Sequence, residues 1–130
     1  MPDTVSRRHG LLVLLCASEG TRLGNDRDAV ELIGAAAAHH ADLVAIPTER
    51  LDDHFFRLHT RIAGDILQKF VNYRLRLAIV GDISAHLAAS ASLRDFVYES
   101  NRGRHVWFVA DLAELDERLE RLHRQGLPGG

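Results

Sequence analysis

A chain of 130 residues has the length of one domain, and its 46% hydrophobic and 26% charged content is typical of a soluble globular protein. The formal net charge of −2 comes from 16 basic and 18 acidic residues mixed along the chain, which argues against DNA or RNA as a partner. The longest apolar run, residues 11–17, is too short to span a bilayer and holds the single cysteine, so we expect a cytoplasmic protein without disulfides.

The N-terminal part predicts a β-hairpin and then a helix. Residues 4–8 form a short strand, Gly10 a tight turn, and the apolar stretch LLVLLCA a second strand that is buried on both faces. The stretch GNDRDAVELIGAAAAHH changes to helical periodicity, and Asn25 caps this first helix.

The middle of the chain predicts a strand at residues 43–46, which Pro47 ends, and then the second long helix. The stretch DDHFFRLHTRIAGDILQKFVNY has apolar residues at three- and four-residue steps, the strongest helical stripe in the chain. Gly64 within it indicates close packing on the sheet, and Asn72 is the expected C-cap.

The C-terminal part predicts a buried strand that ends at Gly81, a loop of small residues (ISAHLAASA) and a helix capped by Ser92. Asn101 and Gly103 are expected to stop that helix with positive φ angles. HVWFVA is the last strand, and a capping box introduces a final amphipathic helix.

These elements predict a single α/β domain over residues 1–124 and a flexible tail at 125–130. After the hairpin, helices and strands alternate, and the right-handed crossover rule then gives a mainly parallel sheet. We expect about five strands covered by about four helices.

Four stretches together resemble the bacterial proteins grouped as domain of unknown function family 4180: FFRLHTRIAGDILQKFVNYR, LRLAIVGDIS, SLRDFVYESNRGR and VWFV. The resemblance covers nearly the whole chain and implies no activity, cofactor or catalytic residue. The element order is also similar to that of the STAS domain of anti-sigma-factor antagonists, in which a loop before the second long helix carries a phosphorylated Ser or Thr. Thr60 falls at that place, but Leu58 and His59 replace the Asp-Ser-Ser-Gly type of motif.

Several polar residues follow the predicted parallel strands, where loops leave the carboxyl edge of the sheet. The candidate ligand-binding residues are Glu49, Asp82, Ser84 and Asp111. If they lie close together, they can hold Mg²⁺ or a polar ligand. The alternative is structural, because Asp111 caps a helix and Asp82 finishes a turn.

A candidate partner surface includes Phe55, Phe56 and Thr60 near the second long helix. Adjacent aromatic residues cannot both face one core from a regular helix, so one of them is expected to be partly exposed. The second part is the polar run Glu99, Ser100, Asn101 and Arg102, which we expect to lie apart from the Asp82 edge.

The sequence supports no metal site or cofactor: the eight histidines lack zinc-ligand spacing, and no phosphate loop, nucleophile elbow or dinucleotide fingerprint is present. Arginine makes up fifteen of the sixteen basic residues, which we attribute to coding bias on a solvated surface. The favoured interpretation is a non-catalytic STAS-like regulatory or interaction module that binds a protein partner or a second copy of itself as a homodimer, and neither nucleic acid nor membrane. The alternative is a small-ligand-binding protein or enzyme that uses the polar edge.

Overall fold

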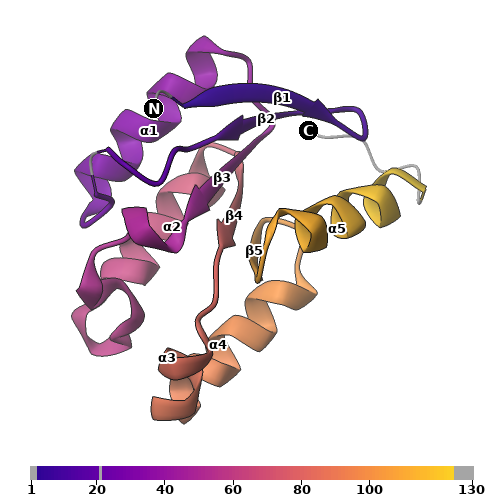
Figure 1. Ribbon diagram of the computed structural model, residues 1–130. Helices are drawn as coiled ribbons and strands as arrows, with labels where there is room; N and C mark the ends of the chain where they lie inside the picture. Colours follow the sequence, from indigo (N-terminus) through magenta and orange to yellow (C-terminus); the bar gives the residue numbers. More distant parts are fainter. Residues whose placement is uncertain (1–2, 21, 125–130) are drawn as a thin grey trace.

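Five strands form one sheet in which the spatial order follows the chain order (Figure 1). The computed structural model describes residues 3–20 and 22–124, and the predicted tail at 125–130 lies outside them. The strands are β1 (Thr4–Arg8), β2 (Leu11–Leu15), β3 (Leu43–Pro47), β4 (Arg76–Val80) and β5 (Val106–Val109). β1 is antiparallel to β2, and each later strand pairs in parallel with its predecessor, which confirms the predicted mainly parallel α/β fold.

The β1–β2 hairpin turns at His9 and Gly10, which both have positive φ angles, 48° and 85°. Two consecutive positive φ angles are the signature of a type I′ turn, whose twist matches the twist of the strands it joins. The predicted tight turn at Gly10 is therefore confirmed.

Three of the five helices in the described part of the chain pack on one face of the sheet and a fourth packs on the other. The helices are α1 (Asp26–Ala38), α2 (Ile62–Asn72), α3 (Ser84–Ala89), α4 (Ala91–Arg102) and α5 (Leu112–Arg124). Buried residues of α1, α2 and α4 share one core, whereas α5 covers the opposite face (Figure 1). None of these helices combines the length and the apolar content needed to cross a membrane.

Strand residues alternate between the two cores, as the two-residue period of a strand requires. In β3, Val44 and Ile46 join the core under α1 and α2, whereas Leu43 and Ala45 join the core under α5. All four are buried, which explains why this strand is apolar throughout instead of alternating with polar residues.

The second long helix, α2, begins seven residues after Phe55, the first residue of the apolar stripe that predicts it. The stretch between β3 and α2 forms three 3₁₀ turns instead: η1 (Thr48–Arg50), η2 (Asp53–Phe56) and η3 (Leu58–Thr60). Arg61 then adopts a left-handed conformation with φ of 65°, and a regular helix cannot pass through such a residue. The C-cap of α2 is Tyr73 and not Asn72.

The predicted loop of small residues contains the short helix α3, which adds a fifth helix to the four expected. Ser90 caps α4, because its Oγ accepts the Leu93 amide at 3.1 Å, and Ser92 lies inside the first turn. α4 continues through Asn101, and Gly103 ends it with an extended conformation, φ −86° and ψ −170°. The prediction of positive φ at these two residues is therefore wrong.

Two glycines differ in what surrounds them. Gly81 ends β4 with φ of 149°, and a Cβ there would overlap Thr48, with Cγ2 only 2.8 Å away. Gly64 is exposed on α2, and no heavy atom outside its own helix backbone lies within 4 Å of where its Cβ would be. The predicted close packing of Gly64 on the sheet is therefore wrong, whereas Gly81 allows the end of β4 to lie close to Thr48.

We expect Gly81→Ala to lower the free energy of unfolding by about 1–3 kcal/mol, because it combines an unfavourable φ with a clash against Thr48. Gly64→Ala is the matched control, and it should raise stability by about 0.5–1 kcal/mol because alanine favours an exposed helix. Urea denaturation of both variants measures these values. Equal effects of the two substitutions would contradict the close approach at Gly81.

Candidate functional site

The carboxyl ends of β3 and β4 form a polar edge, but the sheet has no crevice of the kind that dinucleotide-binding proteins use. Such a crevice opens where the strand order reverses and neighbouring helices leave toward opposite faces. Here β2 to β5 follow one another without reversal, and the helices between them stay on one face. Any site at this edge must therefore be built by the loops themselves.

Two of the four candidate ligand residues share one hollow. Glu49 and Asp82 line a space of about 180 Å³ between the turns η1 and η2 and the start of α3, together with Asp52 and Asp53. We call this space the rim hollow. Ser84 does not line it, and Asp111 lies beyond β5 and does not line it either.

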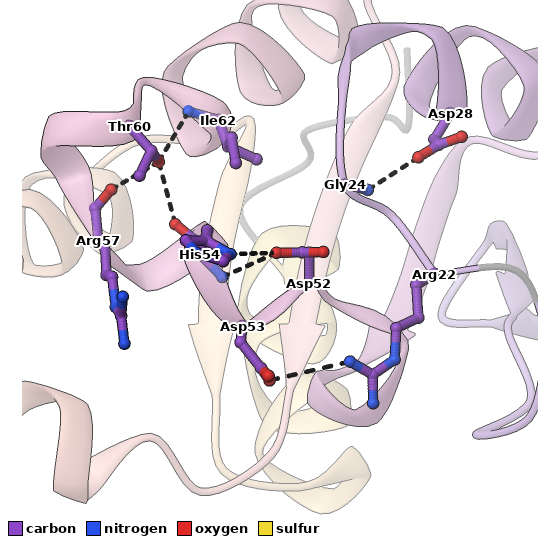
Figure 2. Close-up of polar contacts among 9 residues, drawn as sticks. All are labelled: Arg22, Gly24, Asp28, Asp52, Asp53, His54, Arg57, Thr60 and Ile62. Atoms are coloured by element: carbon purple, nitrogen blue, oxygen red, sulfur yellow. Dashed lines mark hydrogen bonds and ion pairs between the residues drawn. The ribbon is translucent and has the colours of Figure 1, made fainter.

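The carboxylates of this edge accept hydrogen bonds from nearby backbone amides. Asp82 Oδ1 accepts the Ser84 amide at 2.9 Å, and the side-chain and backbone hydrogen bonds from Ser84 lower the pKa of Asp82. Asp52 accepts the His54 amide at 2.9 Å and faces His54 Nδ1 at 3.0 Å, and these contacts lower the pKa of Asp52 (Figure 2). Both carboxylates therefore stabilise the loops in which they lie.

Asp111 starts α5 with a capping box. Its Oδ1 accepts the Glu114 amide at 2.9 Å, while Glu114 Oε1 accepts the Ala110 amide at 3.1 Å. This is the structural role that the sequence offered as the alternative. Within residues 3–20 and 22–124, no three His, Cys, Asp or Glu side chains are grouped as metal ligands.

Thr60 is half-buried at the start of α2, and its hydroxyl is engaged in the turn (Figure 2). Oγ1 lies 2.7 Å from the Arg57 carbonyl and 3.0 Å from the His54 carbonyl, to which it can donate, and it accepts the Ile62 amide at 3.3 Å. These contacts close η3 and support the first turn of the helix. Arg57, by contrast, extends its side chain away from this network (Figure 2).

Phe55 and Phe56 are both buried, with 1% and 8% of their surfaces exposed, so the prediction that one of them is partly exposed is wrong. The reason is that they lie on a 3₁₀ turn over the edge of the sheet and not on a regular helix. Phe55 enters the main core, whereas Phe56 stacks on His86 of α3 with ring centroids 4.4 Å apart. The pair therefore attaches the turns to the core and to α3, and Phe56 also lines the space beside α3.

A larger cleft of about 730 Å³ lies beside this stacked pair, between the turns η2 and η3 and the helices α3 and α4. We call it the α3 cleft. Leu58, Ala85 and Ala89 give it an apolar part, and the basic side chains of Arg57, His59 and His86 also line it. Sequence reasoning did not select these basic residues, although they are close to the Phe55 and Phe56 pair that it did select.

Within the polar run on α4, the side chain of Asn101 forms hydrogen bonds with the neighbouring strand β5. Its side chain pairs with the backbone of Phe108, accepting the amide at 2.7 Å and donating to the carbonyl at 3.2 Å (Figure 1 shows α4 beside β5). β5 is an edge strand, and an exposed edge attracts other strands unless it is covered. Asn101 therefore protects the edge of the sheet.

The polar run was expected to lie apart from the Asp82 edge, and for Asn101 this prediction is wrong. Asn101 lines a hollow of about 230 Å³ together with Asp82 and Ser84. Phe108, with whose backbone its side chain pairs, lines the same hollow. Glu99 and Arg102 are exposed and form an ion pair at 3.6 Å, while Ser100 is half-buried.

Arg50 is a structural residue that sequence reasoning missed. It is 8% exposed, and its Nη1 donates to the Ala17 carbonyl at 3.0 Å and to Asp3 Oδ1 at 3.3 Å. The guanidinium thus joins the loops that follow β2 and β3. No local signal distinguishes this arginine from the fourteen others in the chain.

Cys16 packs beside the core, and burial, together with the negative charge of Asp3, raises the pKa of its thiol to about 12. A thiol with such a pKa is protonated at neutral pH, and a protonated thiol is a poor nucleophile. This agrees with the interpretation of Cys16 as a packing residue.

The fold and the polar edge define a small α/β protein with loop-built clefts and a single mixed sheet. Residues 8–119 match the family model described as Domain of unknown function (DUF4180), so the chain belongs to that family. No curated protein and no solved structure gives a significant match.

We expect Asn101→Ala to lower the free energy of unfolding by about 1–3 kcal/mol, because it leaves the Phe108 amide and carbonyl without side-chain partners. Hydrogen exchange at the Phe108 amide should become faster in the same variant. Glu99→Ala is the control on the same helix, and its exposed position predicts a change within about 0.5 kcal/mol. Unchanged exchange at Phe108 would contradict the edge-protecting role.

Proposed function

We propose that this protein is a non-catalytic, STAS-like interaction module that binds a protein partner at the α3 cleft. The observation that carries the proposal is the connection between β3 and α2. It runs over residues 48–61, whereas such connections in α/β units typically have roughly two to six residues. Long ordered loops on a rigid scaffold are where binding surfaces are usually found.

The connection between β3 and α2 is held in one conformation by internal contacts, and this order supports a role in binding a partner. Asp52 caps η2, Thr60 closes η3, and Phe56 stacks on His86 across the cleft. A surface that is ordered before binding loses less conformational entropy when a partner binds.

The chemistry of the cleft supports a partner with acidic and apolar side chains. Arg57 and His59 are exposed on the wall that also carries Leu58, and Ala85 and Ala89 of α3 line the other. Asp53 also lines the cleft, but its carboxylate is paired with Arg22 at 3.8 Å. In the STAS-like interpretation, the same region, just before the second long helix, is the regulatory surface. The connectivity of hairpin, helix and parallel strands supports that interpretation, whereas the absent phosphorylation motif sets this chain apart from anti-sigma-factor antagonists.

We expect Arg57→Glu/His59→Glu to abolish partner binding, because it reverses charge on the exposed wall without removing buried contacts. The immobilised chain is used to capture proteins from a native lysate, and light scattering gives its own mass. Arg27→Glu/His39→Glu is the matched control, since Arg27 is exposed on α1 and His39 is exposed at its C-cap. The proposal fails if the cleft variant and the parent retain the same proteins, or if nothing is retained and the chain is monomeric.

The rim hollow favours a second candidate function, binding of a small polar ligand by Glu49 and Asp82. A screen of thermal stability with Mg²⁺, nucleotides and common metabolites tests it. A ligand at one hundred times its Kd should add about 2.7 kcal/mol of stability, and Asp82→Ala should remove that gain. If Asp82→Ala responds like the parent, the ligand does not bind at the rim hollow.

A further inference from the structure

Four arginines line one cleft at the opposite end of β5 from the polar edge. Arg102, Arg104, Arg118 and Arg121 surround a space of about 400 Å³ together with Asn101, Gly103, Trp107 and Leu122. None of the residues that line this space is acidic. We call it the arginine cleft.

The fold brings these residues together from two parts of the chain. α4 ends at Arg102 and the following turn carries Arg104, whereas Arg118 and Arg121 lie one helical turn apart on α5. α5 passes beside the C-terminal end of α4 because it crosses to the opposite face of the sheet (Figure 1). The grouping is therefore a property of the tertiary structure.

The floor of the cleft is held in place by specific contacts. The guanidinium of Arg118 lies over the Trp107 ring at 5.4 Å from the centroid and donates to the Asn101 carbonyl at 3.0 Å. Trp107 Nε1 in turn donates to the Gly103 carbonyl at 2.8 Å. Arg118 is thus oriented by an aromatic ring and by a carbonyl at the end of α4.

The positive charge of the cleft is largely uncompensated. Among residues 3–20 and 22–124, neither Arg104 nor Arg121 has an acidic partner within ion-pair distance, and Arg102 has only the exposed Glu99 at 3.6 Å. Burial lowers the pKa of Arg118, and the nearby charge of Arg121 lowers it further, while the charge of Glu114 offsets part of this. Like charges held this close favour an anion between them.

We propose that the arginine cleft binds a small, multiply charged anion that carries phosphate groups. Planar guanidinium groups match phosphate oxygens with paired hydrogen bonds, and several of them converging on one space favour more than one negative charge. A volume of about 400 Å³ fits within the roughly 300–1,000 Å³ of small-molecule sites. The overall net charge of −2 argues against an extended nucleic-acid surface.

Calorimetric titration of the full chain with pyrophosphate at low ionic strength tests the proposal. The parent should bind saturably, and Arg104→Gln/Arg121→Gln should bind at least about tenfold more weakly, because it removes two charges and their charge-assisted hydrogen bonds to the anion. Both residues are exposed, so the double variant should fold. Arg7→Gln/Arg27→Gln changes the net charge equally at exposed positions on β1 and α1, and it should bind like the parent.

A second variant tests the electrostatic argument in the opposite direction. Glu99→Gln removes the carboxylate that competes for Arg102, so it should bind pyrophosphate several-fold more tightly than the parent does. No saturable binding by the parent, or equal weakening in both double variants, would overturn the proposal. Tighter binding of a short single-stranded oligonucleotide, with the same dependence on Arg104 and Arg121, would also overturn it in favour of nucleic acid. These results do not depend on the α3 cleft, whose residues the variants leave unchanged.

Discussion

The handedness of the crossover connections is the constraint on which the architecture depends. Parallel strands joined in chain order require each helix to cross over the sheet in the right-handed sense, and this places α1, α2 and α4 on the same face. Only the last helix is free of this requirement, because no strand follows it within the described residues. α5 can therefore cover the opposite face, and its N-cap at Asp111 starts that change of direction.

This arrangement also determines where binding surfaces can form. Without a reversal of strand order, the sheet opens no crevice between diverging helices, so recognition has to use connections and helix ends. The β3–α2 connection supplies the α3 cleft, and the turn after α4 supplies the arginine cleft. α4 reaches both clefts, since its cap Ser90 lines one and its last residue Arg102 lines the other.

Acidic and basic side chains gather at different places on the surface, although the net charge of the chain is only −2. The chain is nearly neutral overall, yet arginines from α4 and α5 gather around one space, while carboxylates gather near the ends of β3 and β4. The acidic groups are engaged with backbone amides, as Asp52, Asp82 and Asp111 illustrate. The arginines Arg104 and Arg121 have no such internal role among the described residues, which makes them available to a ligand.

Sequence alone determined the features that depend on neighbours along the chain. The five strands and four of the five helices follow from apolar periodicity, and the caps at Asn25 and Asp111 follow from side chains that reach amides three residues away. The sequence also predicted that Glu49 and Asp82 lie at one edge of the sheet, because the carboxyl ends of parallel strands meet at the same edge, and both residues line the rim hollow.

The tertiary structure decided the features that depend on residues far apart in the sequence. Phe55 enters the main core and Phe56 stacks on His86 of α3, and the side chain of Asn101 pairs with the backbone of Phe108 on β5. The arginine cleft requires the end of α4 and the middle of α5 to meet. Periodicity and capping act over about one helical turn, whereas these contacts arise only when the sheet has brought distant segments together.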